Sequence, residues 1–73
     1  MAEVTEATIR VNGADVPLAA PSLSALLAER GVAADRRGIA VAVNGAVVPR
    51  SAWHTTLLRA GDNVEIVIAR QGG

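Results

Sequence analysis

The sequence predicts a small α+β domain, with one helix on one face of a mixed sheet of four to five strands. Two patterns indicate this class. Apolar and polar residues alternate over 4–11 and again over 64–69, and apolar residues recur at helical spacing over 23–30. A period of two is typical of a half-buried strand, whereas spacings of three and four are typical of a helix packed on one side. At 73 residues, the chain has room for one domain.

The first predicted strand spans residues 4–11 and leads into a hairpin. Asn12-Gly13 suits a type I′ turn, which needs a positive φ at both central residues. Residues 14–18 then return antiparallel to the first strand. Because Pro17 cannot donate a ladder hydrogen bond, we expect this second strand at an edge of the sheet.

The helix is predicted over residues 23–30. Ser22 is a favourable N-cap, because its hydroxyl can accept a hydrogen bond from a free amide of the first turn. Gly31 supplies the left-handed conformation that commonly ends a helix. Spacings of three and four place three leucines on one apolar stripe: Leu23, Leu26 and Leu27.

The second half of the chain begins with another predicted hairpin. Residues 39–43 alternate large residues with alanines, so we expect the large ones to face the helix. Asn44-Gly45 predicts a turn into a short strand at 46–48. Val47 and the alanines should then lie on the helix-free side.

A short irregular segment precedes the last strand. Residues 50–54 suit a single turn capped by Ser51. Trp53 should close one end of the core, with its indole N–H bonded to a partner. Residues 64–69 are rich in β-branched side chains and form the last predicted strand.

This order of elements restricts the topology. A compact solution places the first and last strands side by side and parallel in the centre, with the other strands outside them and the helix on one face. That is the β-grasp, or ubiquitin-like, arrangement. It predicts six nearly fully buried side chains: Leu26, Leu27, Ile39, Val41, Ile66 and Ile68.

The composition excludes several kinds of site. Without cysteine the chain has no thiolate and no disulfide, and with a single histidine, His54, it cannot build a Cys/His metal cluster. We expect His54 to be structural or solvent-exposed, because its neighbours offer no acid or nucleophile. A net charge of zero and one aromatic residue argue against nucleic-acid binding. No apolar run is long enough to span a membrane and no secretory signal is present, so we expect a cytoplasmic location.

The last four residues, 70–73, are Arg-Gln-Gly-Gly and should form a tail beyond a folded domain at 1–69. Gly72 and Gly73 lack a Cβ, so the tail could enter a channel too narrow for other residues. An extended tail reaches about 13 Å beyond its anchor. Two interpretations follow from these residues alone, a tail that presents its carboxylate to a partner and a frayed end.

Several segments resemble one known family. Residues 43–53 resemble the VNGxxVPRSxW segment of the ThiS family, and residues 58–67 resemble its LxxGDxVEIV segment. Gly72-Gly73 is similar to the end of that family's chains, and residues 23–27 are similar to its LxxLL stretch. Arg70 departs from the family pattern, in which an apolar residue is common at this place.

The resemblance implies a sulfur carrier of thiamine biosynthesis. An adenylating enzyme, ThiF, would use ATP-Mg to convert the Gly73 carboxylate to an acyl-adenylate. Sulfur from a cysteine desulfurase relay would then replace the adenylate and give a thiocarboxylate. Thiazole synthase, ThiG, would consume that sulfur, and Gly72 would let the tail thread to an enclosed active site. The chain itself would bind no cofactor or metal and would act as a co-substrate rather than an enzyme.

We expect the activating enzyme to dock on the helix-free face of the sheet. Val47 and Val67 have no core to fill on that side, and exposed apolar patches mark interaction sites. Arg70 would contribute beside the tail.

Three other functions fit parts of the sequence. The small subunit of molybdopterin synthase resembles this fold and also ends in Gly-Gly, although those chains tend to be longer and richer in phenylalanine, which is absent here. A ubiquitin-like modifier would instead attach its terminal glycine to lysines of other proteins. A plain binding module would have an inert tail.

Overall fold

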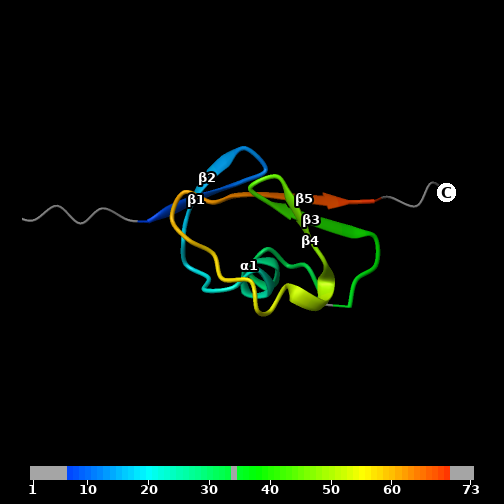
Figure 1. The fold of residues 1–73 in the computed structure, drawn as a ribbon. Helices are drawn as coiled ribbons and strands as arrows, with labels where there is room; N and C mark the ends of the chain where they lie inside the picture. Colours follow the sequence, from blue (N-terminus) through cyan, green and yellow to red (C-terminus); the bar gives the residue numbers. More distant parts are fainter. Residues whose placement is uncertain (1–6, 34, 70–73) are drawn as a thin grey trace, which may run out of the picture.

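A helix lies against one face of a five-stranded mixed sheet in the computed structural model, which describes residues 7–33 and 35–69 (Figure 1). The strands are β1 (Thr8–Val11), β2 (Ala14–Pro17), β3 (Ile39–Val43), β4 (Ala46–Val48) and β5 (Asn63–Ile68). The helix α1 is Leu23–Glu29, and a 3-10 turn η1 is Arg50–Ala52.

The strand order is β2-β1-β5-β3-β4, so β5 lies in the middle of the sheet. It pairs in parallel with β1 on one side and antiparallel with β3 on the other. This topology confirms the predicted β-grasp fold, with its first and last strands adjacent in the centre. Pro17 lies in the edge strand β2, as its missing N–H requires. Residues 4–6 of the first predicted strand lie outside the described residues.

Local signals placed the turns and the helix correctly. Asn12 and Asn44 have φ of 50° and 52°, and each is followed by a glycine with positive φ, as a type I′ turn requires. The Oγ of Ser22 accepts a hydrogen bond from the Ala25 N–H at 3.2 Å and caps α1. At the other end, Gly31 has φ 78° and donates to the Ala28 carbonyl, which closes the last turn.

The core lies between α1 and the sheet and is closed at one end by Trp53. Its indole N–H donates to the Val48 carbonyl at 2.9 Å, so the prediction of a bonded, buried tryptophan is confirmed. The buried residues are Ile9, Val11, Ala20, Leu23, Leu26, Leu27, Val41, Trp53, Leu58 and Val64.

Part of the predicted core is wrong. Ile68 is 39% exposed, and Ile39 and Ile66 are half-buried rather than fully buried. The seven residues of α1 extend about 10 Å, whereas the six residues of β5 extend about 20 Å. The helix therefore cannot cover the whole strand. Burial falls along β5 from Val64, which is fully buried, to Ile68 at its end.

A second correction concerns η1. The sequence predicted a turn capped by the side chain of Ser51, but the turn begins after Pro49 and no side chain caps it. The backbone of Pro49 accepts from the Ala52 N–H at 2.9 Å instead. Proline fixes its own φ, so Pro49 sets the chain direction at this point without a capping side chain.

Candidate functional site

The predicted reacting group follows the end of β5, the central strand. Gly73, Gly72 and Arg70 all lie outside the described residues, and their roles stay predictions. Ala69 is the last residue described before them. Its N–H donates to the Gly38 carbonyl at 2.6 Å, which continues the β3–β5 ladder by one residue. The chain is therefore held in the sheet up to Ala69, the residue before the predicted tail.

Gly38 packs directly against this end of β5. It has φ +76°, and a Cβ built on it would lie 3.4 Å from the Ala69 carbonyl oxygen and 3.5 Å from the Ala69 Cβ. A side chain at residue 38 would thus be both conformationally strained and close to the backbone that leads to the tail.

Gly38→Ala should lower the free energy of unfolding by about 1 kcal/mol, because alanine is disfavoured at positive φ. It should also speed amide exchange at Ala69. Gly45→Ala is the matched control, since Gly45 has φ +84° and nothing within 4 Å of its Cβ. Urea unfolding should show similar losses in both variants. Unchanged exchange at Ala69 in Gly38→Ala would contradict a role for Gly38 at the base of the tail.

Arg50 connects this region to the core. Its guanidinium lies 4.5 Å from the centroid of the Trp53 ring, within the range of a cation–π contact. The same side chain donates to the carbonyl of Arg36, two residues before Gly38. The segment that holds Ala69 is therefore fastened to a buried aromatic residue through Arg50.

The helix-free face of the sheet carries the predicted docking residues. Val47 is 75% exposed and Val67 is 60% exposed. In the β3 register, Ala42 lies opposite Val47 and Ala40 lies opposite Val67. The two valines therefore flank a strip of small side chains. The structure confirms that both valines are exposed on this face, and docking there stays a prediction.

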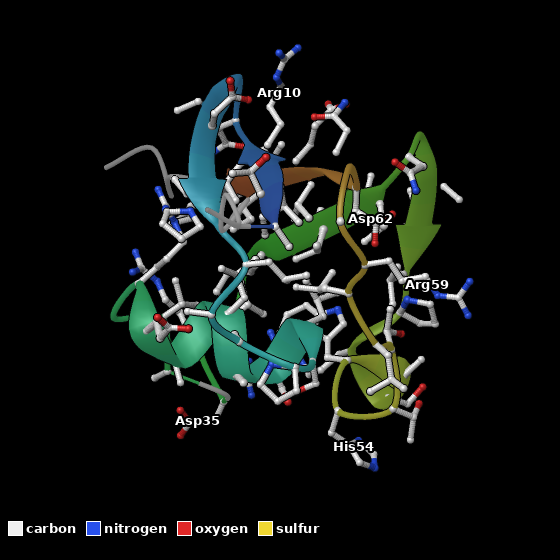
Figure 2. All side chains as sticks on the ribbon, turned by 90° about the vertical axis from the view of Figure 1, so that its left-hand side faces the viewer. Arg10, Asp35, His54, Arg59 and Asp62 are labelled. Atoms are coloured by element: carbon white, nitrogen blue, oxygen red, sulfur yellow. The ribbon has the colours of Figure 1, made fainter. Side chains whose placement is uncertain are left out.

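Polar residues border the same face. A shallow depression beside Val67 is lined by Arg10, Asn12, Gly13, Asn63, Glu65 and Val67. Figure 2 shows Arg10 pointing away from the sheet on the side opposite α1. Its Nε lies 3.3 Å from Asp15 Oδ1, and both side chains are mostly exposed. Such an exposed pair contributes little stability, so Arg10 can exchange this partner for another at small cost.

Comparison with known families identifies the chain. The model of the ThiS family matches residues 9–73. The chain belongs to the ThiS family. Among solved structures, it is similar to the thiamine biosynthesis protein (ThiS) from Geobacter metallireducens, at 29% identity and a TM-score of 0.73, over 90% of this chain and 99% of that one. Comparison with curated proteins gives no match.

The two longest segments that resemble the ThiS family meet at the start of β5, at the end of the strand away from the tail. Residues 43–53 comprise the β3–β4 turn, β4 and η1, and include Arg50 and Trp53. Residues 58–67 enter β5 through a turn in which Asp62 Oδ2 accepts from the Arg59 N–H at 2.8 Å. Figure 2 shows both residues at that turn, with the Arg59 side chain extending outward. Both segments thus hold β5, the strand that leads to the ThiS-family Gly-Gly pair.

Sequence reasoning missed two residues that act on β5. Asn12 and Asn44 were given only a role in their turns, but each carboxamide also binds the backbone of β5. The repeated Asn-Gly pair is the only local signal, and it does not reveal a contact between residues far apart in the sequence. Leu57 was also missed as an exposed apolar residue, 68% exposed on the segment that bridges to Ser22.

Other kinds of site find no support in the described part of the chain. His54 is exposed, and Figure 2 shows it pointing outward, away from the labelled acidic side chains. Within residues 7–33 and 35–69, no group of three or more His, Cys, Asp or Glu residues could hold a metal ion. None of the helices in these ranges is long and apolar enough to cross a membrane.

Proposed function

We propose that the chain is a sulfur carrier of thiamine biosynthesis, and that the carboxylate of Gly73 is its reacting group. The match to the ThiS family over residues 9–73 carries the proposal, because it extends to the Gly-Gly pair. The similarity to a solved thiamine biosynthesis protein supports the same pathway. The fastening of Ala69 to Gly38 supports the presentation of a short tail from a fixed origin.

The chemistry needs activation before sulfur can be added. A carboxylate is a poor electrophile, so its oxygen first attacks the α-phosphorus of ATP, with pyrophosphate as the leaving group. A sulfur nucleophile then forms a bond to the acyl carbon and AMP leaves. Hydrosulfide gives the thiocarboxylate directly. When the donor is a persulfide of a cysteine desulfurase relay, a thiol must afterwards reduce the remaining S–S bond.

The roles divide between the chain and its partners. The chain supplies the carboxylate and the docking surface, and it acts as a co-substrate. ThiF supplies the ATP-Mg site and catalyses adenylation. ThiG consumes the sulfur in thiazole formation. Because adenylation consumes ATP, we expect the chain to act in the cytoplasm.

Intact mass spectrometry tests the proposal. The chain is incubated with ThiF, ATP-Mg and sulfide, and one oxygen should be exchanged for one sulfur. Omission of ATP should abolish the exchange. A protein-conjugating modifier would instead give adducts on lysines of other proteins. Absence of any exchange, with a ThiF preparation that activates another ThiS-family chain, would overturn the proposed function.

Val67→Asp should weaken ThiF binding by about tenfold or more, because it places a charge on the exposed apolar part of the helix-free face. The melting temperature should change little, since Val67 is 60% exposed. Leu57→Asp is the matched control. Leu57 is also apolar and 68% exposed, but it lies outside the strands, on the segment that bridges to Ser22. Calorimetric titration should show unchanged affinity for the control. Equal affinities of Val67→Asp and wild type would disprove docking on this face.

A further inference from the structure

Asn12 makes a contact that its place in a turn does not require. β1 ends at Val11, opposite Val64, whereas β5 continues to Ile68 (Figure 1). The Asn12 N–H donates to the Val64 carbonyl at 2.9 Å, which is the last backbone bond between the two strands. The Asn12 side chain then continues the pairing. Its Oδ1 accepts from the Ile66 N–H at 2.7 Å, and its Nδ2 donates to the Ile66 carbonyl at 3.2 Å.

The register of the sheet shows what this contact replaces. The backbone N–H of Asn44 donates to the Asn63 carbonyl, and the backbone N–H of Ala69 donates to the Gly38 carbonyl. The odd-numbered residues of β5 therefore turn their backbone groups toward β3. The N–H and C=O of Ile66 therefore point to the side of β1, which has already ended. The carboxamide of Asn12 acts as one further residue of that strand, because an amide carries the same donor and acceptor as a peptide unit.

We propose that Asn12 is a positioning residue for the Gly-Gly tail, because its carboxamide fixes the second half of β5 and thereby sets the direction in which the tail leaves. This inference rests on the proposed function. Ile66 is the last residue of β5 that any described group holds on the β1 side. After Ile66 the described part of β5 is bonded on the β3 side, up to Ala69. From Ile66 to Gly73 the chain can extend about 23 Å, so a small change of direction in this half of β5 displaces the carboxylate considerably.

Loss of the contact should affect binding rather than chemistry. A strand end held on one side only by β3 samples more directions, and the extra freedom must be lost when the tail enters a channel. Once the tail is seated, the same carboxylate meets the same catalytic groups. The KM of the chain as a substrate for adenylation should therefore rise, whereas kcat should stay the same.

Asn44 provides a matched comparison at the opposite end of the same strand. It occupies the same position of the same turn type, with φ 52° against 50° for Asn12. Its Oδ1 accepts from the Asn63 N–H at 2.9 Å, and its Nδ2 donates to Asp62 Oδ1 at 3.0 Å. Asn44 thus fastens the start of β5, far along the strand from the tail.

The experiment compares Asn12→Gly with Asn44→Gly. Glycine accepts the positive φ of both turns, so each change removes a carboxamide without straining the backbone. Asn12→Gly should speed amide exchange at Ile66 by about tenfold relative to exchange at Val67, whose backbone N–H faces β3. It should also raise the KM for the chain in ThiF-catalysed adenylation by about threefold to tenfold at constant kcat. Asn44→Gly should speed exchange at Asn63 and leave the KM unchanged.

Three results would overturn the inference. Unchanged exchange at Ile66 in Asn12→Gly shows that the carboxamide does not hold β5, and this arm needs no enzyme. Equal rises in KM for both variants show a general loosening of the fold. A lower kcat at constant KM shows an effect on chemistry. Failure of the proposed function is distinct, because the wild-type chain itself is then not adenylated.

Discussion

Gly73→Val should reduce adenylation of the chain by about 100-fold or more, since misplacement of a reacting group by about 1 Å has an effect of that size. A β-branched side chain adds bulk and restricts the backbone at the point where an enclosed active site must close around the tail. The melting temperature should stay at the wild-type value. The buried core ends at Val64, well before the substituted residue.

A variant with one residue appended after Gly73 makes the same point without changing either glycine. It moves the carboxylate away from the catalytic groups, so the mass spectrum should show no exchange of oxygen for sulfur after incubation with ThiF, ATP-Mg and sulfide. Wild type under the same conditions should show one exchange. If the extended variant accepts sulfur as readily as wild type, the reaction does not occur at the carboxylate of Gly73.

The topology could be predicted because its determinants are local. Asn-Gly pairs impose positive φ on two successive residues, and this fixes both hairpins. Ser22 and Gly31 mark the ends of a helix through hydrogen bonds to residues nearby in the chain. With two hairpins and one helix fixed, few ways remain to cover a single sheet. The exposure of Val47 and Val67 could be predicted from the same alternation, because both lie on the side opposite the core.

The parts that could not be predicted depend on distances between elements. The alternation along β5 shows which side faces the core, but not where α1 stops covering it, so Ile68 was wrongly placed inside. The contact of Asn12 with Ile66 joins residues 54 positions apart. A carboxamide that pairs with a strand leaves no periodic trace in the sequence, and neither does Gly38 against Ala69.

Leu26→Ala should lower the free energy of unfolding by about 2–5 kcal/mol, because Leu26 is buried between α1 and the sheet and its truncation leaves a cavity. The total free energy of unfolding of a small domain is about 5–15 kcal/mol, so this single change removes a large share of it. Urea unfolding followed by circular dichroism measures the loss. The size of this loss depends on how completely α1 covers the sheet at Leu26.

Ile68→Ala is the matched control for this cavity effect, since it removes a similar aliphatic side chain from the uncovered end of β5. Ile68 is 39% exposed, against 6% for Leu26, so its truncation opens a smaller cavity and should cost less than about 1 kcal/mol. The ratio of the two losses therefore measures how far α1 reaches along β5. A loss at Ile68 as large as that at Leu26 would contradict this extent of α1, because it would mean that the core covers the end of β5 that leads to the tail.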